Sequence, residues 1–417
     1  MEISLKYGQT ALDFRLPDEV FGGFILPART EQAVDGERLI SSALENPVGS
    51  PKLRDLVKPG ETVAVVASDV TRPCPTAIML PPILKELAAG GVAAKDVVIV
   101  LALGIHRNHT VEEKIRLVGQ SVFDAYQVVD HDPNRCRRLG ETSRGTPADI
   151  FEKAADADRR VALGNVEYHY FAGYSGGAKA LLPGVSSHAA IKNNHAMMVH
   201  ELAKAGILEG NPVREDIDEL PKHLSVDFIL NVVLGEDKKI KGAFGGHCLA
   251  AHRAACKMLD GLFQATVPAP GADVVVVSAG GFPKDINIYQ AQKALDNAAK
   301  AVRPGGSIVW VGACDEGFGE AVFEKWLNEA KSSADLIERV KTKFELGGHK
   351  AAAIALVLER CRVFMVSNLP EETAKKLFVT PAKGLEEAVK AALEQAGKGS
   401  KVWVMPHGGS TLPKIVS

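Results

Sequence analysis

The chain has 417 residues, of which 46% are hydrophobic and 24% are charged, a composition that is typical of globular proteins and argues against disorder. Its 49 basic and 51 acidic residues give a formal net charge of -2, so we expect no broad electrostatic surface for nucleic acids or anionic membranes. Small molecules are the expected partners, and the length is sufficient for two or three domains.

The cysteines indicate a reducing compartment, because the six are widely scattered and form no CxxC pair. The same scatter argues against a zinc cluster. The first residues contain no basic segment followed by an apolar core, and the apolar runs are too short to span a bilayer. We therefore expect a cytoplasmic protein that is not associated with membranes.

Short β-branched runs alternate with helix-period segments along the chain, a pattern that predicts parallel sheets covered by helices on both faces. In the first part of the chain, the predicted strands and helices span residues 61–69, 76–91, 95–104, 110–119, 159–168 and 247–264. In the last part, they span residues 272–281, 291–302, 306–314, 361–370 and 401–406. The fold class is therefore expected to be α/β.

A boundary between two domains is predicted in "ATVPAPGADVVVV", where proline, glycine and small residues separate a helix from a new strand. We expect a larger domain at 1–269 and a smaller one at 270–417, both Rossmann-like, with mostly parallel sheets flanked by helices. The last strand, 401–406, could return to the first sheet. Ligands bind at the carboxyl ends of parallel strands, so the active site is expected in the cleft between the domains.

Two histidines directly follow predicted strands and are candidates for proton transfer. His106 follows the strand at 95–104, and His169 follows the strand at 159–168. Imidazole gives and takes protons near neutral pH, so two such groups in one cleft indicate paired acid-base chemistry. The alternative for each is a ring that is satisfied by backbone hydrogen bonds.

The segment "HYFAGYSGGAKALLPG", residues 169–184, places Lys179 after a glycine-rich bend. It is not a Walker phosphate loop, because counting from Gly173 puts Ala178 in place of the second glycine and Ala180 in place of the magnesium-binding hydroxyl. Glycine lets a backbone approach a ligand closely, so Lys179 could hold a phosphate or, if desolvation lowers its pKa, act as a nucleophile. The alternative is a solvated loop lysine.

Asp69, Thr71 and Arg72 lie on the bend after the strand at 61–69. The planar guanidinium of arginine matches a carboxylate or a phosphate, and a nearby aspartate can orient it. The alternative is a simple surface ion pair.

Tyr289, Gln290 and Lys293, in "YQAQKA", have the spacing of one helical face, which could bind an anion or face solvent. His195, in "NNHAMM", belongs to a polar turn that opens a predicted helix, and its ring could bind a metal. No further ligand pattern accompanies it, so most ligands of any metal must come from outside the protein.

Together these motifs resemble those of the nickel-dependent lactate racemase family, whose members racemise or epimerise 2-hydroxy acids. "SDVTRP", "LGIHR", "HYFAGYSGGAKALLPG", "NNHAMM" and "YQAQKA" occur in the family's order over most of the chain, and the long central motif is the most specific. The resemblance implies the nickel-pincer nucleotide as cofactor, a pyridinium-3,5-bisthiocarboxylate mononucleotide that carries Ni(II).

The resemblance also implies residue roles at the cofactor. Lys179 matches the lysine that tethers the cofactor covalently, and His195 matches the histidine that completes the coordination of nickel. Asp69, Thr71 and Arg72 belong to the loop that meets the cofactor.

At the substrate, His106 and His169 match the proton acceptors and donors of the family. Four further residues match those that hold the substrate carboxylate or lie beside it: Arg72, Tyr289, Gln290 and Lys293.

The implied reaction has a chemical rationale. The Cα–H of a 2-hydroxy carboxylate is a very weak acid, because deprotonation would put a carbanion beside a negative charge; removal as hydride avoids this. The planar 2-oxo acid can then receive hydride on either face, while one histidine serves each enantiomer.

Two alternatives remain. The chain could be an NAD-type dehydrogenase, although no strand is followed by GxGxxG, or a non-catalytic carrier of the nickel cofactor. Cofactor-biosynthesis proteins and a homo-oligomeric partner are further expectations.

Overall fold

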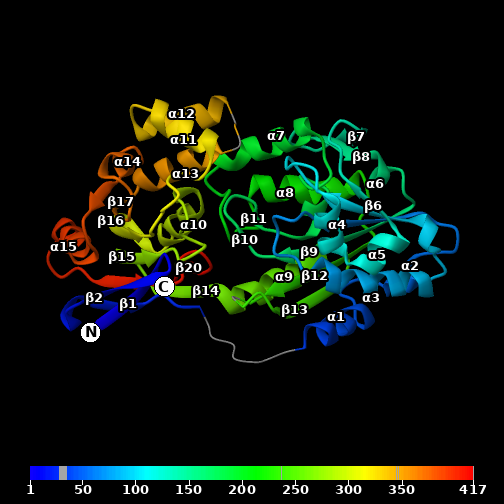
Figure 1. The fold of residues 1–417 in the computed structure, drawn as a ribbon, viewed down its shortest axis with the longest axis horizontal. Coiled ribbons are helices and arrows are strands. Elements are labelled where there is room, and N and C mark those ends of the chain that lie inside the picture. Colours follow the sequence, from blue (N-terminus) through cyan, green and yellow to red (C-terminus); the bar gives the residue numbers. More distant parts are fainter. Residues whose placement is uncertain (28–34, 236, 344, 346, 417) are drawn as a thin grey trace. The chain divides into compact units, whose positions relative to one another are not determined.

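The structure is a computed structural model. It describes residues 1–27, 35–235, 237–343, 345 and 347–416. They divide into two compact units. The described residues of Met1–Thr30 and Gly261–Ser417 form one, which we call the terminal unit, and those of Glu31–Asp260 form the central unit. Figure 1 labels the elements of both. None of the described helices is both long and apolar enough to cross a membrane.

The main sheet of the central unit has the order β13-β12-β9-β4-β5-β6, and among these described strands only β13 runs antiparallel to its neighbour. Its strands are β4 (Val63–Ser68), β5 (Val97–Ala102), β6 (Gln127–Asp130), β9 (Arg159–Val166), β12 (Phe228–Leu234) and β13 (Ile240–Gly246). Short hairpins are formed by β7 (Cys136–Glu141) with β8 (Pro147–Phe151) and by β10 (Tyr168–His169) with β11 (Gly173–Tyr174).

Helices of the central unit cover this sheet because its inner strands are apolar on both faces. Strand β4 is buried from Val63 to Ala67, and its alternate side chains pack in one core cluster with residues of α1 and α3. The helices are α1 (Gly36–Glu45), α2 (Leu53–Leu56), α3 (Thr76–Ala89), α4 (Val111–Val118), α5 (Gln120–Ala125), α6 (Glu152–Ala155), α7 (His188–Ala196), α8 (Pro212–Glu219) and α9 (Cys248–Phe263), which continues into the terminal unit.

The main sheet of the terminal unit is parallel throughout its described strands and has the order β18-β17-β16-β15-β19-β3. Its strands are β3 (Phe21–Phe24), β15 (Ala272–Ser278), β16 (Val302–Val311), β17 (Arg362–Val366), β18 (Thr380–Ala382) and β19 (Val402–Met405). Outside this sheet, β1 (Glu2–Tyr7) pairs with β2 (Thr10–Arg15), and β14 (Gln264–Pro268) with β20 (Leu412–Val416).

In Figure 1, α15 and the β1–β2 hairpin lie on one side of the terminal sheet, whereas α10 and α13 lie on the other. The helices of this unit are α10 (Ile288–Ala298), α11 (Ala321–Glu329), α12 (Ser333–Thr342), α13 (Gly348–Leu358), α14 (Glu371–Lys375) and α15 (Leu385–Ala396). The predicted α/β class with mostly parallel sheets flanked by helices is confirmed.

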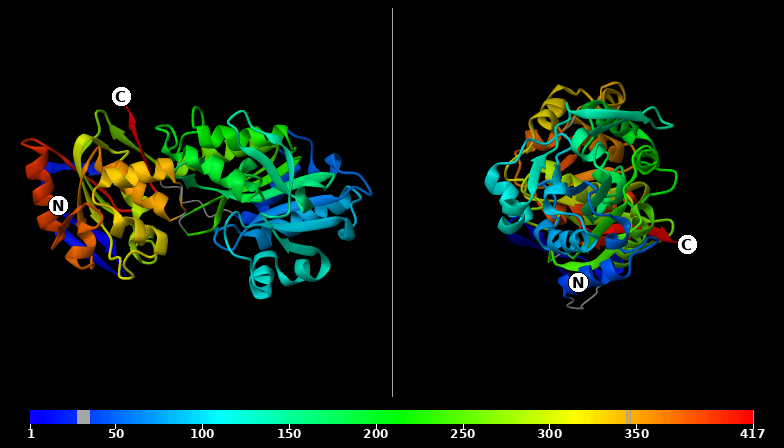
Figure 2. Two further views of the ribbon diagram at one scale, coloured as in Figure 1. Left: turned by 90° about the horizontal axis from the view of Figure 1, so that it is seen from above. Right: turned by 90° about the vertical axis from the view of Figure 1, so that its right-hand side faces the viewer.

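The N-terminal residues belong with the C-terminal part of the chain. Strand β3 pairs in parallel with β19, and Leu5 and Phe14 of the hairpin share a core cluster with Val276 of β15. The left view of Figure 2 shows the blue N-terminal strands beside the orange C-terminal helix. The arrangement therefore differs from the expected division into 1–269 and 270–417, because pairing between distant segments leaves no local sequence pattern. The last predicted strand, β19, pairs with β15 and stays in the terminal sheet.

Candidate active site

Three predicted site residues follow neighbouring strands of the central unit. Asp69 directly follows β4, His106 lies in the loop after β5, and His169 ends β10, which comes just after β9. Strands β9, β4 and β5 are parallel neighbours. Their carboxyl ends, and with them the three side chains, therefore lie at the same edge of the sheet.

Asp69 and His106 form a carboxylate–imidazole pair. Asp69 is almost fully buried (2% exposed), and its Oδ2 lies 2.6 Å from His106 Nδ1, while Thr71 Oγ1 donates to the same carboxylate at 2.9 Å. Burial alone would raise the pKa of Asp69, but the contacts with His106 and Thr71 outweigh it and leave the pKa below its ordinary value. The ionised carboxylate accepts a hydrogen bond from Nδ1–H of His106. In a neutral ring with its proton on Nδ1, Nε2 carries no proton and can accept one.

A further histidine, for which the sequence predicted no functional role, fixes the backbone of the Asp69 loop. His109 Nε2 accepts the backbone N–H of Val70 at 3.1 Å, and its Nδ1 lies 2.7 Å from Asp130 Oδ1. Because Nε2 accepts, the ring proton is on Nδ1 and is donated to Asp130. The sequence offered no signal for this role, since Asp130 is distant along the chain.

His169 has a different hydrogen-bond environment from His106. Its Nδ1 accepts the backbone N–H of Ala172 at 3.2 Å within the hairpin of β10 and β11. A neutral ring held in this way carries its proton on Nε2, which then donates. In their neutral forms, the two histidines therefore offer opposite groups, an acceptor at His106 and a donor at His169.

The ring of Phe171 links His169 to His195, the predicted metal ligand. The Phe171 centroid lies 4.5 Å from that of His169 and 4.9 Å from that of His195, with edge-on geometry in both pairs. The structure thus brings these two predicted site residues into one aromatic cluster. Within the described parts of the chain, no group of three or more His, Cys, Asp or Glu side chains could hold a metal ion.

His195 lies near the end of α7 and is buried, with its Nδ1 3.2 Å from Asn194 Oδ1. The expectation that it opens a helix was wrong. The helix starts earlier because Ser187 caps it, accepting the backbone N–H of Ala190 through its hydroxyl.

The loop that carries Lys179 requires glycine at two positions. Gly176 and Gly177 have positive φ angles of 80° and 61°. A Cβ at Gly176 would lie 2.7 Å from Asn231 Oδ1, and one at Gly177 would lie 2.9 Å from the ring of His252. The loop is therefore packed directly against β12 and α9, which a larger residue would prevent.

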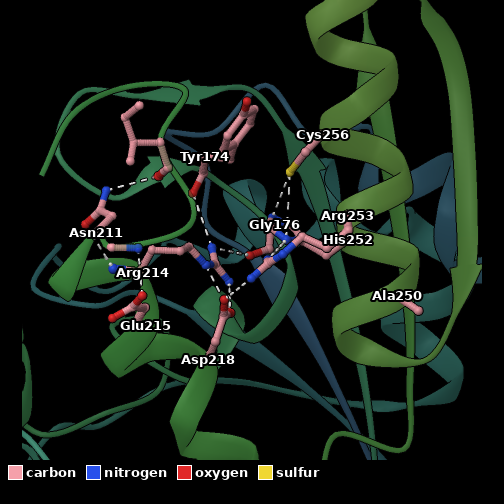
Figure 3. A network of polar contacts seen from close by, with 12 residues as sticks. Tyr174, Gly176, Asn211, Arg214, Glu215, Asp218, Ala250, His252, Arg253 and Cys256 are labelled. Atoms are coloured by element: carbon pink, nitrogen blue, oxygen red, sulfur yellow. Dashed lines mark hydrogen bonds and ion pairs between the residues drawn. The ribbon is translucent and has the colours of Figure 1, made fainter. Parts of the chain in front are cut away.

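An arginine and a histidine hold three consecutive carbonyl groups of this loop (Figure 3). Arg214 Nη1, from α8, donates to the carbonyls of Tyr174 and Gly176 at 3.3 and 3.4 Å. His252 Nε2, from α9, donates to the Ser175 carbonyl at 2.8 Å. Burial, together with the charge of Arg214, lowers the pKa of His252 well below its ordinary value, so the ring is neutral.

Asp218 neutralises the positive charge of this network. It accepts from Nε of the fully buried Arg214 at 3.0 Å, and it also pairs with Arg253, whose Nη1 donates to His252 Nδ1 at 2.7 Å. Burial would raise the pKa of Asp218, but the two guanidinium groups outweigh it and lower the pKa. Sequence reasoning missed this network, because the segment of α8 has the pattern of an ordinary amphipathic helix.

No described residue forms a hydrogen bond or an ion pair with the amine of Lys179. Its pKa lies well below the ordinary value for lysine, chiefly because the half-buried amine loses hydration to the protein atoms around it. The positive charges of Arg72 and Arg214 lower the pKa further, and Glu167 opposes them in part. The lowered pKa increases the fraction of neutral amine, which is the form that acts as a nucleophile.

Tyr289, Gln290 and Lys293 lie on α10, in the terminal unit, whereas the residues described above belong to the central unit. The predicted helix is confirmed, and Asn287 caps it by accepting the backbone N–H of Gln290 at 3.0 Å. Gln290 and Lys293 are exposed. Tyr289 is half-buried, and burial raises its pKa to about 12, so its hydroxyl is a proton-bearing donor.

The chain is similar to lactate racemases over most of its length. The family profile described as lactate racemase N-terminal domain matches residues 7–206, and the lactate racemase C-terminal domain profile matches residues 267–412. The lactate racemase of Thermoanaerobacterium thermosaccharolyticum is 35% identical over 422 residues, which cover 98% of each chain. That of Lactiplantibacillus plantarum is 31% identical over 424 residues and 99% of each chain.

Solved structures agree with these matches. The lactate racemase apoprotein from T. thermosaccharolyticum matches with a TM-score of 0.90 and 33% identity, over 99% of this chain and 100% of that one. A Thermotoga maritima protein matches with a TM-score of 0.62 and 19% identity, over 92% and 99% of the two chains, which is a likeness of fold alone. Both profiles and both full-length relatives lead to one conclusion: the chain belongs to the lactate racemase family.

Proposed function

We propose that this protein is a racemase or epimerase of 2-hydroxy acids that works with a nickel-pincer nucleotide tethered to Lys179. The observation that carries the proposal is the arrangement in the central unit of an oriented acceptor at His106, an oriented donor at His169 and an amine at Lys179 whose pKa is lowered. The two curated relatives named lactate racemase support the reaction class.

The residues of the central unit fit a cofactor that is attached to the protein. The pKa of the Lys179 amine is lowered and the amine has no hydrogen-bond or ion-pair partner among the described residues, while the glycines before it let the loop approach a ligand closely. His195 would give nickel one imidazole, and the loop of Asp69, Thr71 and Arg72 would meet the cofactor. When bound, the nickel-pincer nucleotide would supply a hydride acceptor and donor for the substrate carbon.

The two histidines would handle the hydroxyl proton. His106 Nε2 would accept it from one enantiomer, and the Asp69 carboxylate would stabilise the imidazolium that results. A protonated His169 ring would return a proton to the oxygen of the planar 2-oxo acid, and proton exchange with solvent would restore both rings after the turnover. In the reverse direction a protonated His106 would donate and a neutral His169 would accept at Nε2. For this the proton of neutral His169 must move to Nδ1, which breaks the contact with the backbone N–H of Ala172.

The substrate carboxylate would be bound by the cations of Arg72 and Lys293, with the Gln290 amide and the Tyr289 hydroxyl as further donors. Lactate or a related hydroxy acid is the proposed substrate. A cytoplasmic location and an interaction with the proteins that make the cofactor belong to the same proposal.

The function is tested with protein from a host that makes the cofactor. Chiral chromatography should detect interconversion of the enantiomers of at least one acid among lactate, malate, phenyllactate and sugar acids. The protein should contain nickel, and mass spectrometry should find an added mass on the peptide that contains Lys179.

Three outcomes would contradict the proposal. If the cofactor-loaded protein interconverts the enantiomers of none of these acids, the proposed racemase activity is wrong. Substrate-dependent change in nicotinamide absorbance would identify a dehydrogenase instead. Binding of the cofactor without any catalysis that depends on the histidines would identify a carrier.

Replacing either histidine by alanine should slow racemisation in both directions. Because each ring accepts the proton in one direction and donates it in the other, His106→Ala and His169→Ala should each lower kcat about 10²- to 10⁴-fold. Initial rates from each pure enantiomer measure the effect. His200→Ala, at an exposed position in the loop after α7, is the matched control and should keep the wild-type rates. A histidine variant with unimpaired rates would remove that ring from the mechanism.

Asp69→Asn should preserve the shape of the Asp69–His106 pair but lose its charge, and kcat/KM should fall on the order of 10²-fold. The pKa of Asp69 is lowered in the folded protein, so the native carboxylate stays ionised as the pH falls until that lowered pKa is reached. The ratio of native to variant kcat/KM should therefore be constant around neutral pH and shrink only in strongly acidic solution. A pH profile of both proteins decides this, and equal kcat/KM values near neutrality would contradict it. Thr71→Ser, which keeps a hydroxyl beside the carboxylate, is the control.

A further inference from the structure

Lys350 is a buried lysine of the terminal unit that has no carboxylate partner among the described residues. It lies in the first turn of α13 and is only 5% exposed. Its ammonium donates to the carbonyl of Tyr289 at 2.5 Å and lies 3.8 Å from the centroid of the Tyr289 ring. The carboxylate that acts on it electrostatically, that of Asp296, pairs instead with Lys300 at 2.8 Å.

Packing fixes the start of α13 and therefore the position of Lys350. A Cβ at Gly348 would lie 2.2 Å from the ring of Trp326 on α11, and one at Gly347 would lie 1.9 Å from Glu320 at the start of the same helix. The two glycines thus allow a close contact between α13 and α11. This contact between the helices keeps the side chain of Lys350 in the interior of the terminal unit.

The environment of Lys350 leaves positive charge uncompensated. An ammonium has three donors, and the Tyr289 carbonyl takes one of them. The ring of Tyr289 offers a favourable face for the cation, but neither group carries a formal negative charge. Burial lowers the pKa of Lys350 to about 7, and the positive charge of Lys293 contributes to this. A buried ammonium of this kind is stabilised strongly by an added anion.

We propose that Lys350 is a further cation of the carboxylate site to which the proposed function assigns Arg72 and Lys293, and the second that the terminal unit contributes. A carboxylate bound at α10 would then be held by one exposed and one buried ammonium, while Lys350 also positions Tyr289. The identity of the ligand as a 2-hydroxy acid rests on the proposed function; the anion site itself rests on the contacts of Lys350.

The proposal implies that binding takes up a proton. A carboxylate beside Lys350 favours the charged amine and raises its pKa above the value in the free protein, so at a pH slightly above 7 the amine gains a proton as the anion binds. Burial lowers the pKa of His349 to about 3, Asp296 is paired, and Glu320 accepts backbone N–H groups at the start of α11. Lys293, the remaining charged neighbour, is the partner cation.

Calorimetry of glycolate binding to the full-length protein tests the proposal. Glycolate is a 2-hydroxy acid without a chiral centre, so no enantiomer is produced during the titration. Titrations at pH 8 in buffers that differ in ionisation enthalpy give both the affinity and the number of protons taken up. The native protein should bind glycolate with uptake of a fraction of a proton.

Two variants and one control separate binding from folding. Lys350→Met should abolish the uptake and weaken binding roughly 10- to 100-fold, the range for a hydrogen bond to a charged group. Lys350→Arg should restore much of the affinity without uptake, because arginine stays charged. Lys375→Met, at an exposed lysine of α14 paired with Glu371, should match the native protein in both quantities. Circular dichroism checks that each variant is folded.

The outcomes distinguish this inference from the proposed function. Native affinity and native proton uptake in Lys350→Met, or no glycolate binding by the native protein, would overturn the inference. Uptake that depends on Lys350 in a protein that racemises nothing would leave the carboxylate site standing and reject the racemase. Racemisation with an unchanged KM in Lys350→Met would leave the racemase standing and reject the role of Lys350 in the carboxylate site.

Discussion

The chemistry proposed for the central unit depends on Lys179, a half-buried lysine whose amine has no hydrogen-bond or ion-pair partner among the described residues. Arg214 connects the fold of this region to its chemistry, because its guanidinium donates to the carbonyls of the loop before Lys179 and its charge lowers the pKa of that lysine. A buried arginine is tolerated there since Asp218 neutralises it, and Gly176 lets the loop pack tightly enough for the contacts to form. The same interactions that hold the loop therefore also favour the neutral amine.

The sheet determines which of the predicted groups lie at one edge of the central unit. Three parallel neighbouring strands bring Asp69, His106 and His169 to one edge, but the local hydrogen bonds make the two histidines unequal. His106 is oriented by a carboxylate, whereas His169 is oriented by a backbone N–H. Enantiomers have equal free energies in solution, so this inequality cannot shift the equilibrium of a racemase. Its effect is confined to the rates of the individual proton transfers.

The sequence predicted the elements that depend on local pattern and missed those that depend on distant contacts. Continuous apolar runs indicate buried parallel strands, and polar residues directly after them indicate the ligand-binding edge, which is why β4, β5, β15 and α10 were recognised. The pairing of β3 with β19 moved the first residues into the terminal unit, and no local signal foretold it. Arg214 and Lys350 were missed for the same reason, since each lies in an ordinary helical segment and acquires its role only through partners far along the chain.

The central claim, that the pKa of the Lys179 amine is lowered well below the ordinary value for lysine, is open to direct measurement. Lys179 is partly exposed, so an N-hydroxysuccinimide ester can acylate it in cofactor-free, full-length protein, and peptide mass spectrometry gives the rate at each pH. Lys375 provides an internal reference, because its ion pairs with Glu371 and Glu372 raise its pKa. The account predicts that acylation of Lys179 reaches half of its maximal rate at a clearly lower pH than acylation of Lys375. Equal pH dependence at the two lysines, or a higher midpoint at Lys179, would contradict it.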